Sequence, residues 1–258
     1  MSKAKSRKAA PVRAKSRQDE SEEAFLRNYR IDEHARPSVT ADVALFTVLQ
    51  DQLCVLLVKR GGHPFKGELA LPGGFLEVGS AYSGQGEDLI DGAERELQEE
   101  TGLRPGEMHL EQLGAFGAPA RDPRMRIITV VYYGLLAPKR AARVQAGDDA
   151  REAGWVPVKK LRSGHLAADH WEILQAALER IDERLRTSSV AADLLPETFT
   201  LSELRRVHEL VRGEPLDPSI FLSVVARLLE DVVLEEVREQ RLRRGAPAVR
   251  YRYVHPSL

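Results

Sequence analysis

The sequence predicts an α+β chain in which a mixed β-sheet lies between helices and a smaller domain follows. Strand-like segments flank helical ones without a regular β–α–β repeat, which favours a mixed sheet between two helical layers. Near residue 191 the pattern changes to two closely spaced amphipathic helices. The 258 residues leave room for two ordinary domains. We expect a disordered basic tail over 1–35, an α/β/α sandwich over 36–190 and a second domain over 191–258.

The first domain is expected to open with a β-hairpin. Residues 38–60 are rich in Val, Leu and Thr and are interrupted by the polar pair Asp51 and Gln52, which is typical of two strands and a turn. A Gly- and Pro-rich loop is expected over 61–74, and apolar residues at helical spacing predict a helix over 86–103.

The rest of the first domain continues to mix strands and helices. Strand patterns cover 107–117, 126–136 and 154–161, and an amphipathic helix is expected over 169–186. His170, at the start of this helix, is expected to be a helix-start or core residue.

The second domain has the element order of a winged helix-turn-helix. Thr200 or Ser202 is expected to cap a helix that ends at Gly213. A second helix begins after Asp217 and Pro218, and the chain closes with an Arg-rich stretch and a strand-like segment. Helix, turn, helix and a hairpin-like end predict this motif.

Composition excludes several classes of protein. The 38 Lys+Arg and 39 Asp+Glu leave a formal charge of −1, which excludes a uniformly basic nucleic-acid coat protein. The single cysteine, Cys54, excludes an intramolecular disulfide and any zinc site with two or more cysteines. A reducing compartment is therefore expected, with the cytoplasm as the location. No apolar run is long enough to predict a membrane span.

The N-terminal segment differs in charge from the rest of the chain. Its first seventeen residues hold seven Lys+Arg and no acidic residue, which leaves 31 Lys+Arg against 39 Asp+Glu elsewhere. Such a segment cannot bury enough apolar surface to fold. A solubilising tail and a contact with nucleic acid are the two interpretations.

An acidic helix face carries the chemistry of the first domain. Glu96, Glu99 and Glu100 are spaced i, i+3 and i+4, so three carboxylates project from one face and repel one another. A bound Mg²⁺ or Mn²⁺ ion, which prefers oxygen ligands, explains such a cluster. The alternative is an exposed acidic face on a surface helix.

The residues around this face resemble the complete signature of the Nudix hydrolase superfamily. Setting aside the seven residues 80–86, the chain reads G-x5-E-x7-R-E-L-x-E-E-x-G-L. The specified positions are Gly74, Glu87, Arg95, Glu96, Leu97, Glu99, Glu100, Gly102 and Leu103. The insertion lies in the loop before the helix, where extra length costs little entropy. An altered position of Glu87 and an altered entrance to the substrate site are the two effects that it could have.

The Nudix resemblance implies hydrolysis of a nucleoside diphosphate joined to another group, with metal held by the glutamates of the box helix. It implies that Glu96, Glu99 and Glu100 are catalytic residues and metal ligands. Glu87, Arg95 and Gly102 are expected to be structural, and Gly73 and Gly74 are expected to let backbone approach the substrate closely.

Three further segments narrow the resemblance. Residues 64–75, 109–133 and 193–221 are similar to a group that combines an ADP-ribose-type Nudix domain with a C-terminal winged helix. This group includes the Nudix-related transcriptional regulators of NAD metabolism, and the similarity covers roughly residues 38–258. It implies a homodimer that senses an ADP-ribose-like nucleotide and binds operator DNA, and some members of the group have lost hydrolysis.

Two sets of arginines are candidate ligand contacts. Arg121, Arg124 and Arg126 lie in a loop entering a strand, where they suit phosphate or ribose oxygens, with ordinary exposed arginines as the alternative. The other set follows the second helix of the winged-helix domain, where it is expected to contact DNA phosphates or to form a solvated hairpin or dimer rim. Its candidate DNA-binding members are Arg241, Arg243, Arg244 and Arg250.

Two functions remain open at this point. Metal-dependent hydrolysis of an ADP-ribose-like compound is favoured because all three glutamates are present. The alternative is a nucleotide-sensing transcriptional regulator in which the same pocket binds ligand with little or no turnover. The winged-helix segment 196–258 holds ten Lys+Arg and ten Asp+Glu, and its second helix has Arg227 as its one cation, so that helix offers little for reading base edges.

Overall fold

The computed structural model describes residues 21–30, 33–79, 86–144, 153–237 and 249–254. Contacts divide the chain into Met1–Arg36 and Pro37–Leu258, which are described separately. In the first unit, helix α1 (Glu22–Asn28) falls within the segment expected to be a tail, and none of its residues is buried. The side chain of Ser21 caps it by accepting a hydrogen bond from the Ala24 amide at 3.3 Å. The seventeen basic-tail residues lie outside the described ranges.

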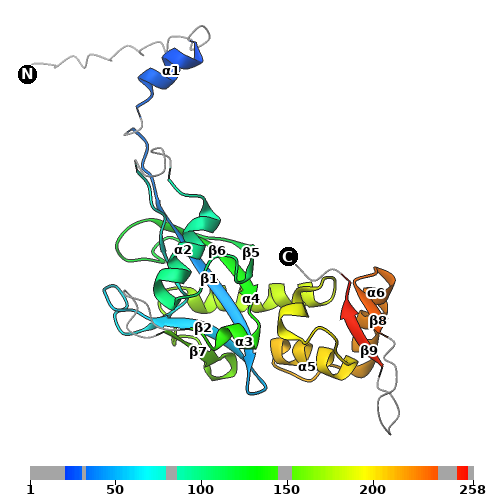
Figure 1. The fold of residues 1–258 in the computed structure, drawn as a ribbon. Coiled ribbons are helices and arrows are strands. Elements are labelled where there is room, and N and C mark those ends of the chain that lie inside the picture. Colours follow the sequence, from blue (N-terminus) through cyan, green and yellow to red (C-terminus); the bar gives the residue numbers. More distant parts are fainter. Residues whose placement is uncertain (1–20, 31–32, 80–85, 145–152, 238–248, 255–258) are drawn as a thin grey trace, which may run out of the picture. The chain divides into compact units, whose positions relative to one another are not determined.

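The second unit begins with a mixed seven-stranded sheet (Figure 1). Its central order is β3-β2-β1-β6-β5, with β4 paired to β1 and β7 paired to β2. Strand β1 runs parallel to β6, and the other pairs are antiparallel. The strands are β1 (Ser38–Leu49), β2 (Gln52–Lys59), β3 (Leu69–Ala70), β4 (Gly73–Phe75), β5 (His109–Phe116), β6 (Ile127–Leu135) and β7 (Ala153–Pro157).

Helices cover both faces of this sheet, which confirms the predicted sandwich. Alternate residues of a strand point to opposite faces. Ala44 and Phe46 of β1 therefore pack in the same cluster as α4 (His170–Leu185), whereas Val43 and Leu45 pack in the cluster that contains α2 (Leu89–Thr101). The described residues before the second domain also form α3 (Pro138–Ala141) and the 3₁₀ turn Val158–Lys160.

Two details differ from the sequence prediction. The expected loop over 61–74 contains strands β3 and β4, which are two and three residues long. Such short strands rest on pairing with β2 and β1 and leave no alternation pattern to read. The strand expected over 154–161 ends at Pro157, where the backbone turns into the 3₁₀ segment.

The second domain is the predicted winged helix-turn-helix. A 3₁₀ turn, Val190–Leu194, precedes α5 (Leu201–Arg212) and α6 (Pro218–Glu230). Strands β8 (Leu234–Val237) and β9 (Arg250–Tyr253) then pair antiparallel. No helix within the described ranges is long and apolar enough to cross a membrane.

Candidate functional site

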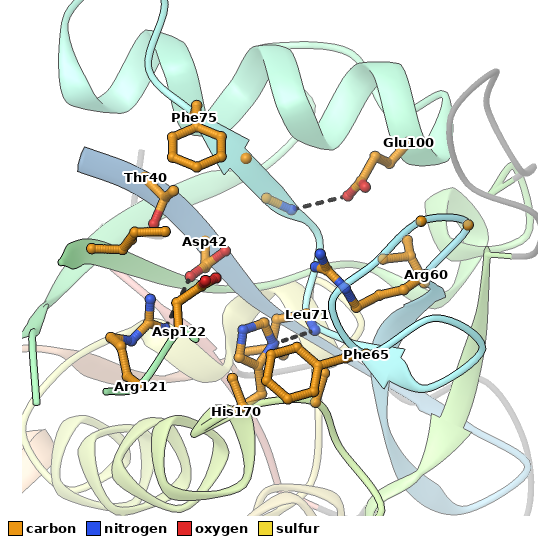
Figure 2. Close-up of a pocket in the computed structure, with 18 of the residues that line it drawn as sticks. Thr40, Asp42, Arg60, Phe65, Leu71, Phe75, Glu100, Arg121, Asp122 and His170 are labelled. Carbon is orange, nitrogen blue, oxygen red and sulfur yellow. Dashed lines mark hydrogen bonds and ion pairs between the residues drawn. The ribbon is translucent and has the colours of Figure 1, made fainter. Parts of the chain in front are cut away.

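A cavity of about 290 Å³ lies where β1, β4, the turn after β2 and the start of α4 meet (Figure 2). Polar and charged side chains dominate its wall. Those that the following argument uses are Asp42, Arg60, Glu100, Arg121, Arg124 and His170. Because these residues come from segments far apart in the sequence, the sheet and its covering helices bring them together.

Helix α2 borders the cavity and carries the glutamates of the box. Its buried face comprises Gly92, Ala93, Leu97 and Thr101, so the sheet fixes the direction of the polar face. The helix ends at Thr101, and the amide of the next residue, Gly102, donates to the Gln98 carbonyl at 2.8 Å.

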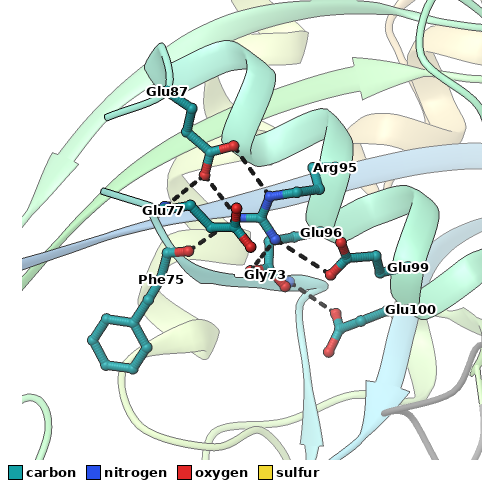
Figure 3. Close-up of polar contacts among 8 residues, drawn as sticks. All are labelled: Gly73, Phe75, Glu77, Glu87, Arg95, Glu96, Glu99 and Glu100. Carbon is teal, nitrogen blue, oxygen red and sulfur yellow. Dashed lines mark hydrogen bonds and ion pairs between the residues drawn. The ribbon is translucent and has the colours of Figure 1, made fainter. Parts of the chain in front are cut away.

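Arg95 joins the glutamates to the strand beneath them (Figure 3). Its Nε and Nη2 donate to the two oxygens of Glu87 at 3.1 and 2.7 Å. Its Nη1 donates to Glu96 at 2.8 Å and to Glu99 at 3.3 Å, and Nη2 also donates to the Phe75 carbonyl at 3.0 Å. The hydrogen bonds from Arg95 hold the pKa of Glu87 below its usual value. This arrangement offsets the repulsion among the carboxylates and ties α2 to the end of β4.

The insertion leaves Glu87 in contact with Arg95. The Glu87 amide donates to the Glu77 carbonyl at 3.1 Å, and the Glu77 amide donates to the Glu87 carboxylate at 2.8 Å. These two bonds join the chain on either side of residues 80–85, which lie outside the described ranges. The described residues on the two sides of the insertion are therefore held together at Glu77 and Glu87.

Glu96 and Glu100 lie close to the β4 backbone. The Gly73 amide donates to Glu100 at 2.9 Å, and a Cβ atom at Gly74 would overlap the Glu96 carboxylate. Burial raises the pKa of Glu100 to about 7, and the neighbouring carboxylates of Glu96 and Asp42 add to this effect. Burial also raises the pKa of Glu96.

The donor set fits a hard cation in its chemistry. Glu96, Glu99 and Glu100 offer oxygen ligands, which Mg²⁺ prefers, and a cation would favour the ionised form of the buried Glu100. In this conformation Glu96 and Glu99 turn toward Arg95, and no three His, Cys, Asp or Glu side chains in the described ranges converge on one point. Nudix hydrolases generally use divalent cations such as Mg²⁺ or Mn²⁺.

A buried charge network forms the floor of the cavity. Asp42 is 6% exposed, and its Oδ2 accepts a hydrogen bond from the Thr129 hydroxyl at 2.6 Å. Arg121 donates from Nε and Nη2 to Asp169 at 2.9 and 2.7 Å, and its Nη2 lies 3.9 Å from Asp42. A bidentate pair of this kind fixes the guanidinium plane. Arg121 therefore already uses its Nε and Nη2 groups in hydrogen bonds to Asp169.

His170 lies beside this network at the first residue of α4. Its Nδ1 accepts a hydrogen bond from the Leu71 amide at 2.9 Å. Burial lowers the pKa of His170, so the ring is neutral and carries its proton on Nε2.

An aromatic ring and a guanidinium mark the rim. The Arg124 guanidinium carbon lies 5.3 Å from the centroid of the Phe75 ring, within the range of a cation–π contact. Asp122 holds Arg124 through bonds of 3.0 and 2.8 Å to Nε and Nη2. The pair offers a flat surface against which a base can stack.

The structure brings together some of the predicted site residues and separates others. Those lining the cavity are Gly73, Gly74, Glu100, Arg121 and Arg124. Glu96 and Glu99 face Arg95 on the adjoining surface of α2. Arg126 does not line the cavity; it is exposed, because it lies at the entrance to β6, where its carbonyl pairs with Ser38.

Sequence reasoning missed Asp42, Arg60 and Asp169 as site residues and treated His170 as a helix-start or core residue. His170 does begin α4 and is buried, and it also lines the cavity. A polar Asp42 within the apolar run of residues 38–60 is a signal that was available in the sequence.

The exposed face of α6 is largely apolar. Ile220 and Leu222 are 53% and 57% exposed, and Arg227 pairs with Asp231 at 3.5 Å. Arg250 lies half-buried on β9. The other candidate DNA contacts, Arg241, Arg243 and Arg244, lie outside the described ranges.

Comparisons with known proteins agree with this architecture. Residues 38–177 match the NUDIX domain, and residues 191–253 match the NrtR DNA-binding winged helix domain. A relative from Acinetobacter baylyi, an ADPR responsive transcriptional repressor NtrR, is 34% identical over 90% of this chain and 88% of its own length. An ADP-ribose pyrophosphatase from Methanocaldococcus jannaschii is 37% identical over 58% of this chain and 77% of its own length.

A solved structure covers both domains. Shewanella oneidensis NrtR complexed with a 27mer DNA is 33% identical, with a TM-score of 0.65, over 83% of this chain and 93% of that one. The chain therefore belongs to the NUDIX family and carries an NrtR DNA-binding winged helix domain after its NUDIX domain.

Proposed function

We propose that this chain is an ADP-ribose-responsive regulator whose NUDIX domain binds the nucleotide and whose winged helix binds operator DNA. The observation that carries the proposal is the extent of its similarity to the Acinetobacter baylyi repressor, which spans 90% of the chain and therefore both domains. The pyrophosphatase relative aligns with only 58% of the chain. Full-length similarity thus favours regulation over hydrolysis alone.

The cavity has the parts that a dinucleotide-like ligand requires. Phe75 and Arg124 at the rim suit a base, and the buried polar floor suits sugar hydroxyls. Gly73 and Gly74 have no side chains, so a ligand can approach this part of the cavity closely, and Arg60, which also lines the cavity, suits the diphosphate. The cavity thus has one region suited to a base, one suited to sugar hydroxyls and one suited to a diphosphate. This combination supports ADP-ribose as the ligand class.

We also propose a homodimer that acts in the cytoplasm. Two winged helices related by a two-fold axis would contact two half-sites of a pseudo-palindromic operator. Light scattering on the full chain should give twice the 28.8 kDa mass of one copy. A monomer at micromolar concentration, alone and with DNA, would contradict the dimer.

A binding experiment tests the regulator. The full chain, kept in EDTA to prevent turnover, is titrated calorimetrically with ADP-ribose and with AMP as the control ligand. In parallel it is used to enrich duplexes from a random DNA library. We expect ADP-ribose to bind at least tenfold more tightly than AMP and a defined sequence to be enriched. Equal affinity for the two nucleotides, or no duplex retained at 50 mM salt, would contradict the proposal.

The second candidate function is metal-dependent hydrolysis of the ADP-ribose diphosphate, which the complete set of box glutamates favours. We propose that Glu96, Glu99 and Glu100 would hold Mg²⁺ or Mn²⁺, which when bound neutralises diphosphate charge and activates water. Arg95 would position Glu96 and Glu99, and the Gly73 amide would fix the carboxylate of Glu100.

A variant series on α2 tests hydrolysis. Glu96→Gln and Glu100→Gln should lower the rate of AMP release from ADP-ribose with Mg²⁺ at least 100-fold, because each removes a charged ligand. Glu94→Gln on the same helix is the matched control and should keep the wild-type rate. If the wild-type chain binds ADP-ribose but releases no AMP, hydrolysis is excluded and the sensor function stands alone.

A further inference from the structure

We propose that Asp42 and His170 form a subsite that selects a ribose hydroxyl of the bound nucleotide. In this subsite the hydroxyl donates a hydrogen bond to the Asp42 carboxylate and accepts one from the Nε2–H group of His170. The inference rests on the proposed binding of an ADP-ribose-like nucleotide and assigns residues of this chain to its sugar.

Asp42 has unused capacity as an acceptor. A carboxylate offers about four lone-pair sites, and within the described residues the structure records one hydrogen bond to this side chain, from Thr129 at 2.6 Å. The neighbouring Arg121 lies 3.9 Å away because Asp169 holds its guanidinium through two shorter bonds. A buried carboxylate is costly unless donors surround it, so a ligand donor is favoured at this position.

His170 supplies the complementary donor. The Leu71 amide engages Nδ1, which leaves the proton of the neutral ring on Nε2. Both Asp42 and His170 line the cavity, and in Figure 2 the His170 ring lies below Asp42. Because the hydrogen bond from the Leu71 amide fixes the tautomer, Nε2 of His170 is a hydrogen-bond donor and not an acceptor.

An acceptor beside a donor selects a group that can do both. A hydroxyl meets this requirement, whereas an ammonium group cannot accept from Nε2–H. A phosphate oxygen within hydrogen-bond distance of the Asp42 carboxylate would meet a like charge, which disfavours it. The geometry therefore places a sugar, and not the diphosphate, on the cavity floor.

The test compares ligands that differ only in hydroxyl groups. The full chain in EDTA is titrated with ADP-ribose and with two analogues, one lacking the hydroxyls of the adenosine ribose and one lacking the ring hydroxyls of the distal ribose. We expect one analogue to bind roughly 10- to 100-fold more weakly, the loss typical of hydrogen bonds to a charged group. The analogue that loses affinity identifies which ribose occupies the subsite.

Variants then assign the loss to these side chains. In the variants Asp42→Asn and His170→Phe, ADP-ribose should bind less than about threefold more tightly than the weaker analogue. The analogue itself should bind these variants with nearly its wild-type affinity. His165→Gln, at an exposed histidine, is the control and should keep the wild-type ratio. His170→Asn, which retains an acceptor for the Leu71 amide, replaces His170→Phe if that variant fails to fold.

The outcomes separate this inference from the proposed function. If the wild type binds ADP-ribose and both analogues equally, the subsite is overturned while nucleotide binding stands. If both variants weaken all three ligands by the same factor, the two residues are only structural and the subsite is again overturned. If the wild type binds none of the three ligands, the proposed function fails, and the subsite fails with it.

Discussion

Gly73 packs so closely against β1 that a side chain at this position would overlap the strand. A Cβ atom there would collide with the Ala41 carbonyl and with Asp42, and the residue has φ +153°. Gly73→Ala should therefore lower the free energy of unfolding by about 3 kcal/mol or more, since neither backbone can yield. Gly154→Ala is the control, because nothing lies within 4 Å of its Cβ position, and it should change stability by less than about 1 kcal/mol. Equal urea midpoints for the two variants would contradict the close approach.

The residues of the site differ in how far the sequence could predict them. Glu96, Glu99 and Glu100 are spaced i, i+3 and i+4. This spacing alone predicted that they share one face of the helix. Asp42, Arg121 and Asp169 are separated by dozens of residues, and the sheet brings them together. No local pattern encodes such a cluster, which is why the cavity floor emerged only from the fold.

At the scale of elements, helices with their own end signals could be predicted closely. Thr200 caps α5 by accepting from the Glu203 amide at 3.2 Å, while Glu203 accepts from the Thr200 amide at 2.7 Å. This capping box is visible in the sequence. The short strands β3 and β4 were missed because pairing with longer neighbours, and not their own residues, makes them strands.

Helix α5 also contains a buried histidine that should make stability depend on pH. His208 is 1% exposed, its Nε2 has no partner among the described residues, and burial lowers its pKa to about 4. The unfolded chain takes up this proton near pH 6.5 and the folded chain only near pH 4, so stability is lost as pH falls through this range. His208→Leu should reduce the loss of unfolding free energy between pH 7 and 4.5 by about 2 kcal/mol.

Urea unfolding at several pH values measures this effect. His165→Gln, a change at an exposed histidine, should leave the wild-type pH dependence intact. An unchanged pH slope in His208→Leu would show that other groups cause the loss of stability.

For the whole molecule, we expect the distribution of charge to determine how the proposed regulator binds DNA. The exposed face of α6 offers apolar Ile220 and Leu222, so phosphate contacts from the Arg-rich segment after β8 should supply most of the affinity. The logarithm of affinity should then fall with the logarithm of salt concentration with a slope of about −4 to −5 if five arginines engage. Changing Arg241, Arg243 and Arg244 together to Ala should flatten the slope by up to about three units and weaken all sequences alike. A triple variant with the wild-type slope would exclude this segment from the DNA interface.

In the proposed regulator, nucleotide binding in the NUDIX domain controls DNA binding by the winged helix. The most direct measurement is the affinity of the full chain for a duplex enriched from the random library, by fluorescence anisotropy in EDTA, with and without saturating ADP-ribose. Coupling between two sites is typically 5- to 150-fold and is reciprocal. We expect ADP-ribose to weaken DNA binding at least fivefold and the duplex to weaken ADP-ribose binding by the same factor. A chain that binds both ligands tightly, with DNA affinity unchanged by ADP-ribose, would contradict regulation of DNA binding by the nucleotide.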